Sequence, residues 1–342
     1  IIACAVPALA AEGAEPDWTG YDELIAKIKA STDFVEREAL MHQAEDMLMD
    51  TGCIVPIYYY NDVYMQKPSV EGVYSNAYGT KYFMHASNGD SAKLRLQLAS
   101  EPDKLDPALN SSVDGACLAA NSFGGLYTYD AEGQLAPNFA TEYTVSDDGL
   151  TYVFTMRDGL KWSDGSDLTA KDFEYSWKRL VNPETASPYA FIGDCLKNGQ
   201  AIEQGKMDVE ELGVKAVDDT TLEVTLEHPT SYFLSLIGSS GQFAPLRQDI
   251  VEKYGTDFAA TSEKNVYSGP FVMTSSEDNV WTFAKNDNYW DKDSINLDKC
   301  ELNYVENTDT QLSMYEAGDL DYVQVPTAYV SDYKDKAEVF AN

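Results

Sequence analysis

Two segments near the start of the chain carry apolar residues at the spacing of amphipathic helices. These positions are Leu24, Ile25 and Ile28 in the first segment and Leu40, Ala44, Met47 and Leu48 in the second. Between the segments, Asp33 and Glu36 have the spacing of a capping box, and Gly52 follows where a C-terminal cap belongs. The pattern predicts a helical hairpin over residues 21–50.

Further along, short runs have the apolar, β-branched and alternating character of strands. The runs are residues 94–98, 151–156, 221–226, 269–274, 280–285 and 299–305. Thr169 and Asp172 form a second capping box, which opens a helix with Phe173 and Trp177 on its buried side. Strands interleaved with helices in this way predict an α/β protein with mixed, α+β sheets.

Residues 53–60 differ from these runs because they are apolar and aromatic almost throughout, ending in three consecutive tyrosines. Such a run predicts a buried strand. Pro56 cannot donate a hydrogen bond to a ladder, so we expect this strand at a sheet edge or at a crossing position.

The chain has 342 residues, with 57 acidic against 24 basic side chains and a formal net charge of -33. Its 44% hydrophobic residues are enough for a sizeable core, and its length exceeds a single typical core. We therefore expect two or more folded domains with an acidic surface. The charge argues against nucleic acid and anionic membranes as partners, because both require clustered lysine and arginine.

Residues 1–16 begin with a small, apolar stretch that resembles the end of an export signal. Within it, residues 8–10 have the form of a cleavage site, and Cys4 lies in a loose lipoprotein box. A short apolar linker or a buried segment would give the same pattern. We expect an extracytoplasmic protein, in the periplasm or anchored at the cell surface, with lipid anchor and cleaved signal both open.

No set of residues forms a recognisable catalytic or metal motif. The histidines accompany neither a GxSxG elbow nor an HExxH pair, and residues 238–241 lack the lysine of a phosphate loop. The five cysteines lie far apart without a CxxC pair, which makes zinc improbable and leaves a disulfide open. An acidic cluster lacks the glycine and terminal glutamate of a calcium loop: Asp287, Asp291, Asp293 and Asp298. We expect no enzyme, no cofactor and no metal.

Several motifs occur together in the chain after residue 17. They are DGLKWSDG at 158–165, LTAKDFEYSW at 168–177, NPETASPY at 182–189, LGVKA at 212–216, SGPF at 268–271, NYW at 288–290, and IVPIYYY at 54–60. In combination they resemble the family 5 extracellular solute-binding proteins of oligopeptide and dipeptide ABC importers. The resemblance implies a type II periplasmic-binding-protein-like fold.

The order of these segments differs from that of the family. Residues 21–86 resemble the end of a family member, while residues 93–342 resemble its beginning and middle. A rearranged or duplicated gene, a fragment and an engineered permutation would each give this order. The domains that the resemblance implies are a hairpin remnant of the second lobe at 17–52, the first lobe at 53–124 and 249–342, and a small α+β side domain at 125–248. The second lobe is expected to be largely missing.

Family members hold an extended peptide between two closing lobes, by backbone pairing and through roomy, wet pockets. The resemblance places ligand contacts at seven positions: Ser111, Ser112, Val113, Tyr189, Tyr60, Gln324 and Val325. Ser111–Val113 are expected to offer backbone groups, and the match at Gln324 and Val325 needs a one-residue gap. Core tyrosines with a satisfied hydroxyl, or an ordinary loop, would also explain these residues.

The resemblance implies a monomeric substrate-binding component that delivers peptides to a membrane-embedded importer permease. Two alternatives stay open: the same scaffold binding nickel, a sugar or another small solute, and a secreted calcium-binding or adhesion module or hydrolase. No position matches the second-lobe aspartate that pairs with the peptide amino terminus in the family's oligopeptide binders. We therefore expect the chain as given to bind peptide weakly or not at all.

Overall fold

The computed structural model describes residues 18–59, 61–76, 78–336 and 338–341. The chain divides into two compact units. One unit comprises the residues up to Tyr58 together with Pro229–Ser231, and the other comprises Tyr59–His228 and Tyr232–Asn342. Among the residues that the structure describes, none of the helices combines the length and the apolar character of a membrane span.

The first unit contains the predicted hairpin, α1 (Thr19–Ala30) and α2 (Phe34–Asp50). Asp33 caps α2, because its carboxylate accepts the backbone N–H groups of Val35 and Glu36 at 2.9 and 3.0 Å. The helix ends at Asp50, and Gly52 follows the C-cap with a φ of +68°, which suits glycine, and an N–H that donates to Met49 O at 3.0 Å. The periodicity and the turn chemistry thus predicted this element correctly.

The sequence predicted a buried strand at residues 53–60, and this prediction is wrong for the described residues 53–59. Residues 53–59 form no strand, and Ile57 and Tyr59 are 82% and 96% exposed. Strand β1 begins only at Asn61 and ends at Gln66. The ladder of β1 with β17 starts at Asn61 and the ladder with β16 starts at Tyr64, and Pro56 has no N–H to donate to a ladder. An apolar run is buried only where other elements cover it.

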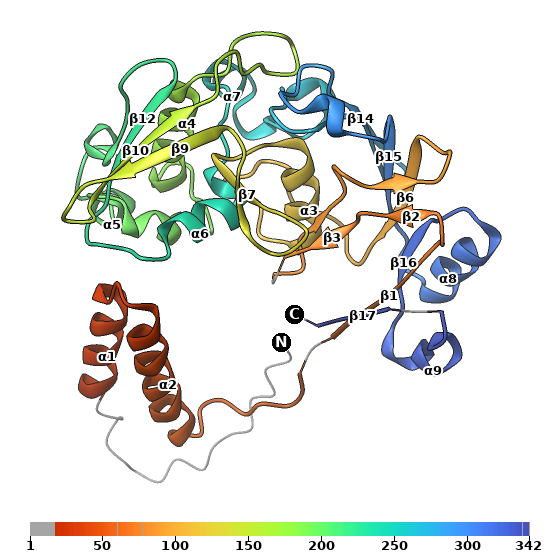
Figure 1. The fold of residues 1–342 in the computed structure, drawn as a ribbon, viewed down its shortest axis with the longest axis horizontal. Helices are drawn as coiled ribbons and strands as arrows, with labels where there is room; N and C mark the ends of the chain where they lie inside the picture. The colour runs from red at the N-terminus through yellow and green to blue at the C-terminus, as the bar shows by residue number, and fades with distance from the viewer. Residues whose placement is uncertain (1–17, 60, 77, 337, 342) are drawn as a thin grey trace. The chain divides into compact units, whose positions relative to one another are not determined.

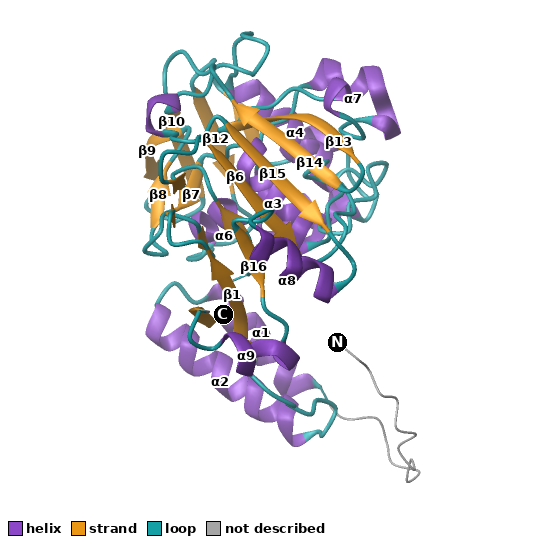
Figure 2. Ribbon diagram, turned by 90° about the vertical axis from the view of Figure 1, so that its right-hand side faces the viewer, coloured by secondary structure: helices purple, strands orange, loops and turns teal. Residues whose placement is uncertain are grey.

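The second unit is built around a seven-stranded sheet, ordered β13-β14-β15-β6-β16-β1-β17. The strands are β13 (Phe271–Glu277), β14 (Val280–Lys285), β15 (Lys299–Tyr304), β6 (Lys93–Leu98), β16 (Tyr322–Gln324), β1 and β17 (Glu338–Ala341). β6 pairs in parallel with β15 and β16, whereas the other pairs are antiparallel. Figure 2 shows β13, β14, β15 and β6 side by side. A strand from the early part of the chain therefore lies between two strands from its end.

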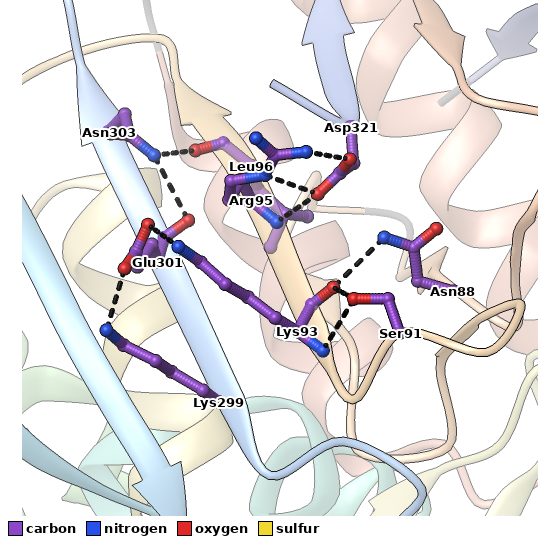
Figure 3. Close-up of polar contacts among 9 residues, drawn as sticks. All are labelled: Asn88, Ser91, Lys93, Arg95, Leu96, Lys299, Glu301, Asn303 and Asp321. Atoms are coloured by element: carbon purple, nitrogen blue, oxygen red, sulfur yellow. Dashed lines mark hydrogen bonds and ion pairs between the residues drawn. The ribbon is translucent and has the colours of Figure 1, made fainter. Parts of the chain in front are cut away.

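Charged side chains hold the parallel centre of this sheet together (Figure 3). Asp321 accepts the Nε and Nη2 groups of Arg95 at 3.0 and 2.7 Å, and also its backbone N–H at 2.8 Å. Lys93 and Lys299 lie opposite each other in the register, and both form ion pairs with Glu301, at 2.7 and 2.8 Å. Like charges placed directly opposite repel, so Glu301 offsets a local conflict.

The sheet contributes to two apolar clusters. Leu94, Leu96 and Leu98 of β6 are almost completely buried in the main core, against α3 (Val113–Ser122) and the rest of the unit. A smaller cluster brings Met65 of β1 and Val323 of β16 together with residues of α8 (Thr308–Ala317). The alternation at residues 94–98 correctly predicted a strand with its three leucines buried, but Gln97 is buried as well, at 5% exposed.

The same unit contains a four-stranded antiparallel sheet, ordered β11-β12-β10-β9, drawn in yellow-green and green in Figure 1. Its strands are β11 (Val214–Ala216), β12 (Thr221–Thr225), β10 (Thr151–Met156) and β9 (Ala140–Val145). α4 (Ala170–Val181) buries Phe173 and Trp177 completely, and its Thr169–Asp172 capping box is formed as predicted. Trp177 Nε1 donates to Phe243 O at 2.8 Å.

Short elements complete the unit. Two-stranded pairs join β2 (Val70–Glu71) to β5 (Ser87–Asn88), β3 (Tyr74–Ser75) to β4 (Lys81–Tyr82), and β7 (Tyr127–Tyr129) to β8 (Leu135–Pro137). The remaining α-helices are α5 (Gly199–Glu203), α6 (Phe233–Ser239), α7 (Gln248–Tyr254) and α9 (Val330–Tyr333). The mixed α/β class expected from the sequence is confirmed.

Candidate functional site

The loop before α3 carries three of the predicted contacts and is organised by one carboxylate, that of Asp103. Ser111 donates to Asp103 through its backbone N–H at 2.9 Å and its hydroxyl at 2.7 Å, and Ser112 donates its hydroxyl at 2.6 Å. The Ser112 oxygen in turn caps α3 by accepting the N–H of Gly115 at 3.1 Å. The structure thus brings Ser111, Ser112 and Val113 together at the start of α3.

The charge of Asp103 is stabilised by this arrangement. Burial alone raises the pKa of Asp103, but hydrogen bonds from Ser112, Ser111 and the Lys104 N–H outweigh burial and lower the pKa to about 2. Asp103 is therefore ionised at neutral pH. Sequence reasoning missed this residue, because eight and nine positions separate it from the two serines and no local motif links them.

A buried ion pair fixes the other end of the loop. Arg179 of α4 donates to both carboxylate oxygens of Asp106, at 3.0 and 2.6 Å, and the Asp106 residue is 3% exposed. Asp106 also accepts the N–H of Ala108 at 3.0 Å. This bidentate ion pair sets both the position and the orientation of the loop relative to α4.

Tyr189 lies on a segment that is bonded to the same loop. Ser187 donates its hydroxyl to Ala108 O at 2.6 Å and accepts the N–H of Tyr189 at 3.2 Å. The half-buried ring of Tyr189 lies 5.7 Å from that of Phe191, measured between centroids. The structure therefore connects the Tyr189 segment with the loop that carries Ser111.

The other predicted contacts lie elsewhere. The N–H of Gln324 donates to Gln97 at 3.0 Å and its side chain to Asp62 at 2.5 Å, both within the large sheet. Val325 is 3% exposed, and its N–H donates to Val63 O at 2.7 Å. These groups are engaged in the fold, and the structure places neither residue in the Asp103 loop. Tyr60, together with the export-signal segment 1–16, lies outside the described residues.

The thiols and acidic groups offer little chemistry. The free cysteines of the described residues are Cys53, Cys117, Cys195 and Cys300. Burial raises the pKa of the Cys117 thiol to about 11 and that of Cys195 to about 12, so neither is a reactive thiolate at neutral pH. Among the residues that the structure describes, no three histidine, cysteine or acidic residues are grouped to hold a metal ion.

Comparison with known proteins places this fold. The family model for "Bacterial extracellular solute-binding proteins, family 5 Middle" matches residues 134–339. A dipeptide-binding protein of Lactococcus lactis is 35% identical over 260 residues, which is 74% of this chain and 47% of the relative. The oligopeptide-binding protein OppA of Bacillus subtilis is 37% identical over 249 residues, which is 70% of this chain and 45% of the relative.

The structure of Listeria monocytogenes OppA bound to peptide superposes with a TM-score of 0.70 at 35% identity, covering 72% of this chain and 49% of that one. The expected type II periplasmic-binding-protein fold is confirmed. The chain spans about half the length of the curated relatives that it matches. Because the family model covers more than half of the sequence, this chain belongs to the family 5 bacterial extracellular solute-binding proteins.

Proposed function

We propose that the chain provides the peptide-contacting lobe of the substrate-binding component of an ABC importer. The observation that carries this proposal is the hydrogen-bond network of the loop before α3. Ser111 and Ser112 are held by a permanently charged Asp103, and the loop is anchored to α4 by the Asp106–Arg179 pair. A loop fixed in this way loses little conformational entropy when an extended ligand binds along it.

Recognition through backbone groups suits a carrier of varied peptides, because every peptide shares the same main chain. Both serine hydroxyls and the Ser111 amide are used by Asp103, so the ligand would be met by the remaining main-chain groups and by Val113. Tyr189 would add an aromatic contact beside the loop. Tyr60, Gln324 and Val325 remain proposed contacts, and the last two are also bonded within the sheet.

The proposed location is extracytoplasmic, in the periplasm or at the cell surface, and the proposed partner is the importer's membrane permease. We also propose the domain scheme of a first lobe at 53–124 and 249–342 with a side domain at 125–248. It is supported by the seven-stranded sheet, whose strands all come from the two outer ranges, and by the four-stranded sheet, which comes from the inner one. Residues 17–52 would be the hairpin remnant of the second lobe.

The test is a titration of the purified chain with tripeptides to pentapeptides, followed by amide NMR so that weak binding is detected. Peptide is expected to shift the amide signals of Ser111, Ser112 and Val113 in a saturable way, whatever its side chains. Asp103→Asn should weaken the response, whereas Asp148→Asn, in an exposed turn of the side domain, should not. If no peptide perturbs the loop up to its solubility limit, the proposal is wrong for this chain.

A further inference from the structure

Helix α3 presents one narrow stripe that is not buried. Seven of its 10 residues are buried, and the three that are not are Val113, Ala116 and Ala120. Spacings of three and four place them one above another on the same face of the helix. Val113, which is 52% exposed, belongs to the candidate peptide loop. The stripe therefore leads from that loop along the helix.

The stripe ends in a hollow of about 60 Å³, which Ala116 and Ala120 line. Its other walls include Tyr82, Tyr289 and the glycine- and serine-containing segment 238–241, where α6 ends. A water needs about 10–15 Å³ by the same measure, whereas a cavity that holds benzene is about 150 Å³. The hollow is thus large enough for a small branched side chain and too small for an aromatic ring.

One buried polar side chain on the wall has unused bonding capacity. Asn138 is 5% exposed, and its Oδ1 accepts both the Tyr289 hydroxyl at 3.0 Å and Trp290 Nε1 at 2.9 Å. These two donors fix which end of the amide is the oxygen. Its Nδ2 forms no hydrogen bond within the described part of the chain. Because Asn138 lines the hollow, this N–H group is available to donate to an acceptor on a ligand.

We propose that the hollow is a side-chain pocket that admits a valine- or threonine-sized residue of a bound peptide and excludes aromatic ones. The proposal rests on the proposed peptide-binding function. A peptide lying along Ser111–Val113 would direct one side chain down the stripe between Ala116 and Ala120. Asn138 Nδ2 would then donate to an oxygen of that residue. The walls are small where the ligand enters, and larger residues there would fill the pocket.

The experiment uses the whole chain with labelled alanine methyl groups, observed by NMR. The ligands are single residues capped as N-acetyl N-methylamides, with valine, threonine or phenylalanine side chains. The valine and threonine compounds should shift the Ala116 and Ala120 methyl signals saturably, and the phenylalanine compound should not. The methyl signal of Ala201, a half-buried alanine of α5 that does not line the hollow, should not move.

A matched pair of variants checks the pocket itself. Ala120→Leu should abolish the response of the Ala116 methyl to the valine compound, while Ala201→Leu should preserve it. Far-ultraviolet circular dichroism shows whether each variant is folded, and Ala116→Leu, read at the Ala120 methyl, replaces Ala120→Leu if that variant does not fold. Equal shifts with valine and phenylalanine, or no saturable shift at the two alanines, would overturn the proposal.

The same spectra separate this inference from the proposed function. If peptides shift the Ser111–Val113 amides but leave the Ala116 and Ala120 methyls unchanged, the peptide-binding function stands and the pocket is refuted. If peptides perturb neither set of signals, both proposals fail. If the capped residues shift the two methyls while peptides never perturb the loop, the hollow binds small molecules apart from any peptide, which also overturns the pocket as proposed.

Discussion

The two sheets of the second unit differ in how far apart their strands lie in the sequence and in the residues at their centres. The four-stranded sheet uses residues 140–225, with α4 inside the same range, and its centre is aromatic: Phe154, Phe173 and Trp177 are fully buried. The seven-stranded sheet joins residues 61–66 to residues 322–341, and charged clamps mark its centre. Apolar packing is sufficient to pair strands that are already close in the sequence. Where the strands are far apart in the sequence, directional bonds such as Arg95–Asp321 select the correct partner strand.

The largest loss of stability is expected from a substitution in the four-stranded sheet. Phe154→Ala should lower the free energy of unfolding by about 3–5 kcal/mol, because it removes a fully buried ring and leaves a cavity. Urea denaturation followed by circular dichroism measures it. The neighbouring exposed Thr155→Ala should change stability by less than about 0.5 kcal/mol. Equal effects of the two substitutions would contradict an aromatic core at this position.

The second largest loss of stability is expected from a substitution in the seven-stranded sheet. Asp321→Ala leaves three N–H donors of Arg95 without their acceptor, which should cost about 2–3 kcal/mol. Hydrogen exchange should accelerate in β6 and β16 while β10 and β12 stay protected. Asp219→Ala is the matched control, because it removes an exposed ion pair with Lys171 and should leave exchange unchanged. Uniform acceleration in both sheets would show that they unfold as one.

The third effect concerns the loop that the Asp106–Arg179 pair joins to α4. The Asp103 carboxyl has a pKa of about 2 in the folded chain, against 3.8 when unperturbed. A lowered pKa contributes stability that is fully present above about pH 4 and is lost as the pH falls through 2, on the order of 1 kcal/mol after solvent screening. Thermal melting of the wild type and of Asp103→Asn across this range measures it. The two curves should converge at the acid end, and parallel curves would exclude this role.

The smallest loss of stability is expected from a substitution of Glu301 in the seven-stranded sheet. Burial raises the pKa of Glu301, but hydrogen bonds from Lys299 and Lys93 outweigh it and hold the pKa below its usual range. Glu301→Gln should cost about 0.5 kcal/mol, since it leaves the two lysines opposite each other on partly exposed positions. The loss should shrink at high salt, which screens exposed charges. An effect independent of salt would indicate lost packing instead.

Sequence reasoning succeeded wherever the cause of a structure is local. The alternation at 94–98, the Asp33 cap and the Thr169–Asp172 box are each decided by neighbours within a few residues. It failed at residues 53–59, because burial depends on which other elements cover a segment. At the candidate site, family motifs pointed to Ser111, Ser112 and Tyr189 as ligand contacts, and these contacts stay predictions. The motifs gave no sign of Asp103 holding both serines, or of Arg179 reaching Asp106 from 73 residues away.

The position of β1 also affects the order of events during synthesis. Asp62 of β1 contacts Gln324 of β16, and 262 residues separate them. At ordinary rates of synthesis the strand would wait roughly 10 to 50 s for its partner, while the four-stranded sheet could already form. Until then, β1 and the exposed apolar residues before it are an unpaired segment, and strands of other chains can pair with it. Aggregation during expression should therefore begin at this end of the protein, and chaperones that bind extended apolar segments should act there first.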